Sequence, residues 1–217
     1  MRTVYGANAS PFVRKVRVFL AEKGIPYNLE PVFPFNPPPE FKQMSPLGKI
    51  PAYKDGDVVL SDSSVICAYL ERTNPQPSLY PADPYDYARA LWYEEYADGG
   101  LVNVLTIKIF RQKIVVPIFF KQPTDEAMVQ KAIAEELPPM FDYLESQLKE
   151  GSTTLVGNQF SIGDIGVATQ FVNLRHGGVG VDTKRWPKLA HYIASVHGRP
   201  SFKAVIAEEE AALKSAA

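Results

Sequence analysis

The stretch "SPFVRKVRVFLAEKG", residues 10–24, has the features of one complete short helix. Serine is a favoured N-cap, and proline is favoured in the first helical turn because its missing N–H would be unpaired there anyway. Gly24 is typical of the residue that follows a helix. One face of the stretch is apolar, and it is formed by Phe12, Val13, Val16, Phe19 and Leu20. We therefore predict a helix over 11–23 that is capped by Ser10.

Strand-like segments lie on both sides of this helix, at residues 2–5 and 27–32. Further on, "AYKDGDVVL" predicts a hairpin of strands 52–54 and 57–60 around the turn signal Asp55-Gly56. A helical pattern follows at 62–72. The predicted order is βαβαββα. It starts with a right-handed parallel crossover and closes with an antiparallel edge of the same sheet.

The chain changes character at "NPQPSLYPADPYD", residues 74–86, whose four prolines suit a stiff connector. After it we predict only helices, at 85–117, 125–149, 161–174, 187–197 and 200–213. The expected domains are an α/β domain at 1–76, a linker at 77–85 and an all-α domain at 86–217.

Two details of the helical half carry structural predictions. In "FSIGDI", Ser161 and Asp164 have the spacing of a capping box, with Phe160 placed to pack on Ile165 as a staple. Gly99 and Gly100 lie inside the first long helix, where each costs about 1 kcal/mol relative to alanine. We therefore expect a bend or a close contact at this pair.

Composition excludes several classes of function. The 23 Lys and Arg residues nearly balance 24 Asp and Glu, so we expect neither a nucleic-acid nor a membrane partner. The N-terminus lacks a signal-peptide pattern and no long apolar run occurs, so we expect a cytoplasmic protein. The single cysteine, Cys67, excludes an internal disulfide, and the three histidines are too scattered to suggest a metal site.

The start of the first helix combines the Ser10 hydroxyl with the basic residues Arg14, Lys15 and Arg17. Helix N-termini already carry partial positive charge, so this arrangement suits an anion such as a thiolate or carboxylate. For the three basic side chains themselves, however, we expect a solvated helix face or a subunit contact rather than a direct ligand contact.

A second helix start, "LSDSSVICAYL" (residues 60–70), holds Asp62 with Ser61, Ser63 and Ser64. Capping needs only one of these side chains, so the others are available to a carboxylate, and Asp62 to an ammonium group. Between the two helix starts, Pro51 stands directly before a predicted strand. A cis Ile50–Pro51 bond would expose the Ile50 backbone to a peptide ligand, but most X–Pro bonds are trans, so the residues alone leave the isomer open.

Taken together, five segments resemble the glutathione transferase family over nearly the whole chain: "SPFVRKVRVFLAEKGIPY", "SPLGKIPAYKDGD", "LSDSSVICAYL", "SIGDIGVA" and "RPSF". The resemblance implies a thioredoxin-like N-terminal domain and an all-α C-terminal domain, in a cytoplasmic homodimer. It also implies a detoxifying transferase that uses glutathione as co-substrate, without a metal, on a small electrophile.

The resemblance also implies roles for particular residues. Ser10 matches the position from which serine-type members activate the glutathione thiol. The tyrosine of tyrosine-type members would fall on Gly6, so Tyr5, one residue out of register, is expected to face the core. Expected glutathione contacts are Lys49, Ile50 and Pro51 (cysteinyl part), Asp62 and Ser63 (γ-glutamyl end), Asn36 or Lys42 (glycine carboxylate), and Asp98 (γ-glutamyl amine of the partner subunit, with Glu94 and Glu95 close by). The expected electrophile pocket draws on Phe12, Val104, Lys108 and Arg111.

Several functions remain open on this resemblance. The leading hypothesis is a serine-type transferase or a glutathione-dependent peroxidase, and a non-catalytic ligand-binding protein on the same fold is the first rival. A glutathione-dependent isomerase such as maleylacetoacetate isomerase is less favoured, because its members resemble "SSCSWRVR" where this chain has "NASPFVRKV". A thiol–disulfide reductase is disfavoured because position 10 is not a cysteine. The identity of the electrophile is left open.

Overall fold

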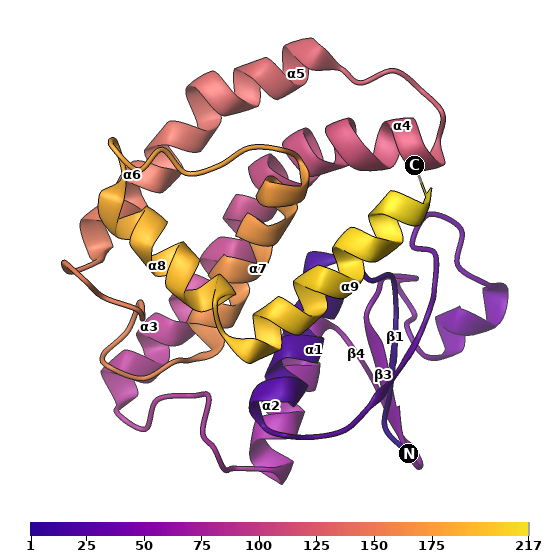
Figure 1. Cartoon of the computed structure of the whole chain (residues 1–217). Helices are drawn as coiled ribbons and strands as arrows, with labels where there is room; N and C mark the ends of the chain where they lie inside the picture. Colours follow the sequence, from indigo (N-terminus) through magenta and orange to yellow (C-terminus); the bar gives the residue numbers. More distant parts are fainter. Residues whose placement is uncertain (217) are drawn as a thin grey trace.

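A four-stranded mixed sheet forms the core of the N-terminal half in the computed structural model, which describes residues 1–216. Its strand order is β2-β1-β3-β4, with bounds Asn28–Glu30, Thr3–Tyr5, Ala52–Asp55 and Val58–Ser61. β1 pairs with β2 in parallel and with β3 antiparallel, and β3 pairs antiparallel with β4. The parallel crossover and the antiparallel edge are thus confirmed, and the sheet lies beside α1 (Pro11–Glu22) and α2 (Ser63–Thr73) (Figure 1).

The predicted order βαβαββα holds with a change in its middle helix. That helix is only a five-residue 3₁₀-helix, η1 (Pro39–Gln43), which buries Phe41. Three consecutive prolines, 37–39, precede and begin it, and since proline has no N–H to donate, a longer helix is disfavoured there.

The hairpin turn lies one residue later than predicted, at Gly56-Asp57, because Asp55 pairs with Val58. Gly56 has φ +61°, a left-handed conformation that glycine adopts without a steric penalty.

The helical half begins after the proline-rich connection. Its elements are α3 (Pro84–Glu95), η2 (Tyr96–Val115), α4 (Val116–Phe119), α5 (Glu126–Lys131), η3 (Ala132–Glu136), α6 (Leu137–Gln147), α7 (Ile162–His176), α8 (Pro187–His197) and α9 (Pro200–Ala216). The first predicted long helix is therefore the continuous run α3–η2–α4. Its hydrogen bonding changes from α to π type at Tyr96, shortly before Gly99 and Gly100. The glycine pair thus lies in wider, π-type helical turns, and the alternative of a close contact is wrong, because a Cβ atom at Gly99 would meet nothing within 4 Å and one at Gly100 would lie 3.8 Å from the Tyr96 ring.

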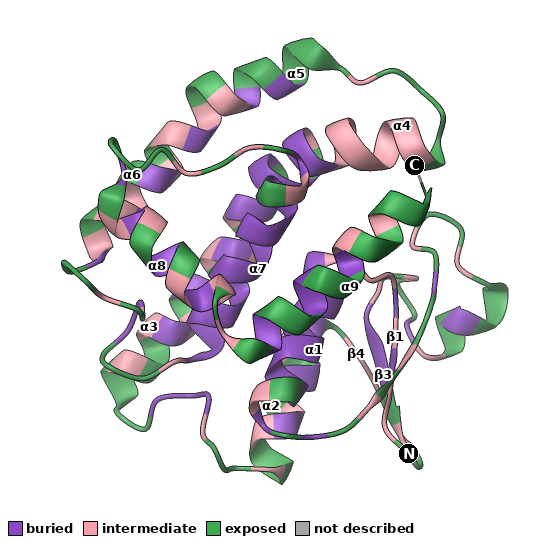
Figure 2. Ribbon diagram, in the orientation of Figure 1, coloured by how far each residue is buried: buried purple, intermediate pink, exposed green. Residues whose placement is uncertain are grey.

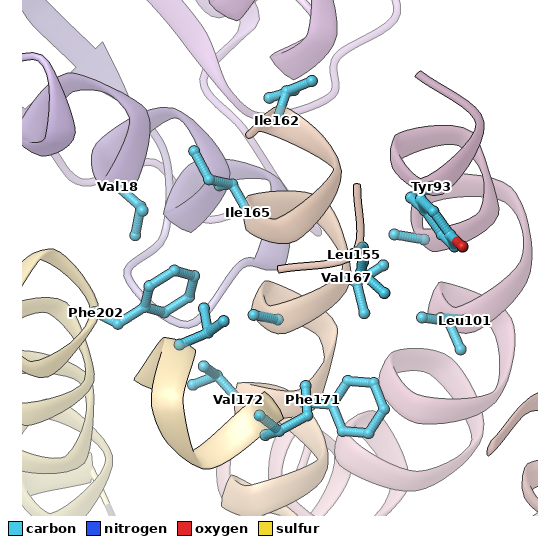
Figure 3. Packing of buried hydrophobic residues seen from close by; sticks show 14 of the residues in the cluster. Val18, Tyr93, Leu101, Leu155, Ile162, Ile165, Val167, Phe171, Val172 and Phe202 are labelled. Carbon is cyan, nitrogen blue, oxygen red and sulfur yellow. The ribbon is translucent and has the colours of Figure 1, made fainter. Parts of the chain in front are cut away.

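Helix α7 is the centre of the main hydrophobic core, and its residues from Ile162 to Leu174 are all buried (Figure 2). In Figure 3, Val18 of α1 and Phe202 of α9 lie on one side of α7, and Tyr93 of α3 and Leu101 of η2 lie on the other. The start of α7 confirms the predicted capping box: the Ser161 side chain accepts from the Asp164 backbone N–H, and the Ser161 backbone N–H donates to Asp164 Oδ2 at 2.8 Å. The Ser161 hydroxyl also donates to the same carboxylate oxygen, at 3.1 Å. This helix therefore joins the two halves through one core.

The basic residues of α1 are buried, so the expected solvated face or subunit contact is wrong. The relative exposure of Arg14 and Lys15 is 0% and that of Arg17 is 3%. Each contacts a carboxylate from the helical half: Arg14 contacts Glu209, Lys15 contacts Glu94 and Asp98, and Arg17 contacts Glu208. The sequence shows cations on a helix, but acids that lie far along the chain neutralise them once α9 and η2 pack against α1.

Candidate active site

A cleft of about 770 Å³ opens between the two halves of the molecule. One wall is built by three N-terminal loops: residues 6–12 between β1 and α1, residues 31–35 after β2, and residues 48–50 before β3. The opposite wall is built by η2, α4 and α9, and the lining is mainly apolar. The cleft thus combines a sheet edge and a helix start with a helical wall.

Ser10 lies in the cleft wall at the start of α1. Its backbone is extended, with φ −73° and ψ 127°, and its Oγ accepts a hydrogen bond from the Val13 N–H at 3.4 Å. The predicted cap is therefore confirmed, although the bond is long. A hydroxyl that accepts through a lone pair still has its own O–H to donate, so capping leaves Ser10 able to bond an anion in the cleft.

Gly6 and Tyr5 have different surroundings, as expected from the alternation of side chains along a strand. Gly6 lines the cleft, and a Cβ atom at this position would lie 2.3 Å from Val13 Cγ2, so a larger residue does not fit. Tyr5 packs instead against a small cluster that contains Val32, Phe41 and Ala52. The prediction that Tyr5 packs into the interior is confirmed.

The Ile50–Pro51 bond is cis, which settles the isomer that the sequence left open. Lys49 and Ile50 line the same cleft as Ser10, and Pro51 is buried. The pairing of β3 with β1 begins at Ala52 opposite Tyr5, so Ile50 lies beyond the end of this ladder. The Ser45 hydroxyl donates to the Lys49 carbonyl at 2.6 Å and fixes the segment before the cis bond.

A separate polar cluster surrounds the start of α2. Asp62 is its N-cap and accepts from the N–H groups of Ser64 and Val65 at 2.9 and 3.2 Å. Ser63 is buried. Asp62 and Ser63 are outside the wall of the 770 Å³ cleft, so the structure does not bring them into direct contact with that space.

Lys15 connects this cluster to the helical half. Its Nζ donates to Ser64 Oγ at 2.9 Å, to Glu94 Oε1 at 2.9 Å and to Asp98 Oδ2 at 2.5 Å. Burial alone would lower the pKa of Lys15, but the two carboxylates raise it above its usual value, so the ammonium stays charged. Asp98 is thus placed beside Lys15 and Ser64 of its own chain, and its other oxygen, Oδ1, is buried without a hydrogen-bond partner.

The four residues expected in the electrophile pocket divide evenly. Phe12 and Arg111 line the cleft. Val104 is buried in the main core, with 2% exposure, and Lys108 forms an ion pair with Glu136 at 2.6 Å outside the cleft wall. The two glycine-end candidates, Asn36 and Lys42, are exposed and also lie outside that wall.

Sequence reasoning missed several cleft residues. Phe33 and Phe35 line it from the loop after β2, and Phe110, Phe119, Ala212 and Leu213 line it from the helical half. The apolar run "VFPF" at 32–35, inside a segment otherwise rich in proline, was the available signal. The residues from α9 carried no such signal, because they only reach the cleft through the packing of α9 on α1.

The described part of the chain, residues 1–216, shows neither a metal-ligand cluster nor a membrane-spanning helix. No group of three or more His, Cys, Asp or Glu side chains is arranged to hold a metal ion within this range. No helix in the same range combines the length and the apolar character needed to cross a bilayer.

This fold, a thioredoxin-like α/β domain followed by an all-helical domain, defines a class of two-domain proteins. The family description "Glutathione S-transferase, N-terminal domain" matches residues 4–78, and "Glutathione S-transferase, C-terminal domain" matches residues 110–209. The chain belongs to the glutathione S-transferase family.

Individual relatives support this assignment. The chain is 32% identical to glutathione S-transferase theta-3 of Mus musculus, over 82% of this chain and 74% of the relative. It is 31% identical to the uncharacterized GST-like protein YibF of Escherichia coli, over 91% of this chain and 94% of the relative. A solved glutathione S-transferase from Rhodospirillum rubrum superposes with a TM-score of 0.87 at 26% identity. The superposition covers 94% of this chain and 91% of the solved one.

The family members that resemble this chain are diverse in function. They include a maleylacetoacetate isomerase of Rattus norvegicus, 26% identical over 82% of this chain and 79% of the relative. They also include a stringent starvation protein A homolog of Coxiella burnetii, 27% identical over 98% of this chain and 94% of the relative. Family membership alone therefore does not select one activity.

Proposed function

We propose that the protein is a glutathione transferase in which the Ser10 hydroxyl activates the glutathione thiol. One observation carries the proposal: Ser10 is at once the N-cap of α1 and part of the cleft wall. A thiolate placed against Ser10 would receive an O–H hydrogen bond and face the partial positive charge of the helix N-terminus. Both interactions favour the ionised sulfur over the neutral thiol.

The free energy of one hydrogen bond from Ser10 is large enough to lower the pKa of the glutathione thiol. A free thiol has a pKa of about 8.5, and each unit of lowering requires about 1.4 kcal/mol. A hydrogen bond to a charged group contributes about 1.5–3 kcal/mol, so Ser10 is able to supply a shift of one to two units. Arg14, Lys15 and Arg17 are already paired with carboxylates, so the hydroxyl and the helix terminus, rather than these cations, would stabilise the thiolate.

The thiolate would then attack an electrophilic carbon, forming a C–S bond as the leaving group departs with its electron pair. With a peroxide, the sulfur would instead bond to one oxygen as the O–O bond breaks and the other oxygen leaves as alkoxide or hydroxide. A second glutathione would then displace hydroxide from the oxidised sulfur to form glutathione disulfide.

Glutathione would extend from Ser10 along Lys49 and Ile50, which share its cleft wall. The γ-glutamyl end would reach Asp62 and Ser63. Asp98, whose buried Oδ1 has no hydrogen-bond partner among residues 1–216, would bind the γ-glutamyl amine of the glutathione held by the partner subunit. The glycine end would be held by Asn36 or Lys42. A homodimer in the cytoplasm completes the proposal on the strength of family membership.

The test is a titration of the bound glutathione thiol, followed by the ultraviolet absorbance of the thiolate. We expect a pKa one to two units below the free value in the wild type, and a return toward the free value in Ser10→Ala. Ser10→Thr, which keeps a hydroxyl, should retain part of the shift. Ser10→Asp preserves a good helix cap but places a carboxylate beside the sulfur, so it should raise the thiol pKa.

This titration, together with an isomerisation assay and a turnover assay, separates the rival functions. A wild-type thiol with an unshifted pKa but saturable glutathione binding would support a non-catalytic binding protein instead. Conversion of a cis-unsaturated diacid to its trans isomer, without net consumption of glutathione, would support an isomerase. A Ser10→Ala variant with unchanged thiol pKa and unchanged turnover would remove Ser10 from the mechanism.

A further inference from the structure

The helical wall of the cleft contains a cation that has no anionic partner among residues 1–216. Arg111 of η2 lines the cleft, and its Nε is buried with no hydrogen-bond partner. No ion pair of Arg111 occurs among the described residues 1–216. Because a buried N–H that stays unpaired costs free energy, this guanidinium is poised to bind an acceptor.

Aromatic rings surround this guanidinium. Its central carbon lies 5.6 Å from the centroid of the Phe35 ring, which is cation–π distance. Phe35 packs against Phe33 and Phe120, with centroid separations of 5.4 and 5.0 Å, and Phe33 packs against Phe119 at 5.8 Å. This aromatic group (Phe33, Phe35, Phe119 and Phe120) joins the loop after β2 to the end of α4. Each of these four residues is between 40% and 46% exposed, so the group offers an apolar aromatic surface.

The other charges in the cleft wall leave it positive. Glu209 is the acidic residue in the wall, and its carboxylate is already bound by Arg14, at 2.5 and 2.8 Å, and by His176 Nε2 at 2.9 Å. Arg14 and the helix packing hold Glu209 away from Arg111, so it does not neutralise the cleft. Lys49 adds a second cation on the opposite wall.

From these observations we infer that the electrophile-binding part of the cleft selects aromatic substrates that carry a carboxylate, with Arg111 as the specificity-determining residue. This inference rests on the proposed transferase function and names its substrate class. The planar guanidinium fork matches a carboxylate, and the aromatic group contacts the ring of the substrate. An uncharged aromatic compound would gain only the second interaction.

The first test compares two electrophiles that share one ring and one leaving group but differ in the charge of one substituent: a chloronitrobenzoate with its carboxylate para and its nitro group ortho to chlorine, and its methyl ester. In both, the glutathione sulfur bonds to the carbon that carries chlorine, chloride leaves with its electron pair, and the thiol proton goes to solvent. We expect Arg111→Gln to raise KM for the carboxylate about tenfold, the loss of one charge-assisted hydrogen bond. The ester should change by less than twofold. Lys113→Gln, on the same helix outside the cleft wall, should change neither.

The second test needs no turnover and separates failure of this inference from failure of the proposed function. Nitrobenzoate and its methyl ester, which have no leaving group, are titrated into the wild type and Arg111→Gln by calorimetry. Tighter binding of the carboxylate that is lost in the variant supports the inference, even if neither chloro compound is turned over. Equal binding or equal KM of acid and ester in the wild type overturns it, whether or not Ser10 activates the thiol.

Discussion

Arg14 is a fully buried charge at the contact between the two halves of the chain. Its guanidinium donates four hydrogen bonds: two to the Glu209 carboxylate, one to the Thr169 carbonyl and one to Asn173 Oδ1. Burial of an isolated charge is costly, so this site is tolerated because each partner satisfies the other. Burial would raise the pKa of Glu209, but the charges of Arg14 and His176 lower it below its usual value.

Removing one partner of this pair should therefore destabilise the protein strongly. We expect Arg14→Met to lower the free energy of unfolding by about 3–5 kcal/mol, because Glu209 would remain buried with its main counter-ion removed. The double variant Arg14→Met, Glu209→Met should recover much of the loss, because no buried charge is left uncompensated. Denaturant titration of the two variants measures both values.

The matched control is Arg175→Met, which breaks the surface pair with Glu210. That pair is well exposed, with side-chain exposures of 55% and 37%, so its loss should cost less than about 1 kcal/mol. If Arg14→Met proved no more harmful than Arg175→Met, the buried network would contribute nothing to stability.

Among the elements, α7 depends on a close approach to α3. A Cβ atom at Gly163 would lie 2.9 Å from the Ala90 carbonyl oxygen and 3.1 Å from Tyr93 Cβ. Backbone and Cβ atoms cannot swing aside as the end of a long side chain can. Glycine is therefore needed at the start of α7 for packing, although alanine is the better helix former.

We predict that Gly163→Ala destabilises the protein by about 1–3 kcal/mol, the usual cost of overpacking a core. Gly99→Ala tests only the greater intrinsic helix propensity of alanine over glycine, because a Cβ atom at exposed Gly99 meets nothing within 4 Å. That variant should be neutral or gain up to about 1 kcal/mol. Thermal and denaturant unfolding would give both differences, and a neutral Gly163→Ala would mean that α3 and α7 separate without penalty.

At the scale of the whole molecule, stability should respond to pH through buried titratable groups of opposite sign. Burial lowers the pKa of His197 to about 4, although its ring N–H is bonded to the Ala168 carbonyl at 2.9 Å. Burial raises the pKa of Asp164 to about 6, against four hydrogen bonds that favour its ionised form. As the pH falls from 6 to 4, His197 therefore lowers the free energy of unfolding, whereas Asp164 raises it.

The lowered pKa of His197 determines whether the protein gains or loses stability as the pH falls. As the pH falls from 6.5 to 4, the unfolded chain binds a proton at this histidine that the folded chain does not, so stability is lost. The variant His197→Gln keeps an N–H donor but cannot titrate. As the pH falls from 6.5 to 4, we expect its free energy of unfolding to rise by about 3 kcal/mol relative to that of the wild type. The difference between the two proteins is the correct readout, because Asp164 titrates alike in both.

The control for this experiment is His191→Gln, whose ring is exposed. Its unfolding free energy should follow that of the wild type at every pH. A His197→Gln variant that also parallels the wild type would show that His197 is protonated equally in the folded and unfolded states.

Local sequence signals predicted most of the fold. The caps at Ser10 and Ser161, the hairpin at residues 52–61 and the helix periodicities are confirmed because each depends on hydrogen bonds and side-chain spacing within a few residues. The middle helix of the βαβαββα order had no predicted residue range, and the structure shows it as the short η1, which begins within the three prolines at 37–39. In the candidate site, Ser10, Phe12, Lys49, Ile50 and Arg111 line one cleft, whereas Val104, Lys108, Asn36 and Lys42 lie outside its wall, and the roles predicted for these residues stay predictions.

The sequence by itself thus determined the elements, their order, the family and the serine at the start of α1. Only the tertiary structure decided what the basic residues of α1 do, because Arg14 and Glu209 are 195 residues apart and meet only when α9 packs on α1. The same packing brings the loop after β2, η2 and α9 together around the cleft, and within the described residues 1–216 it leaves Arg111 without an acidic partner. Periodicity shows which face of a helix is apolar, but the identity of the partner across that face depends on the packing of the whole chain.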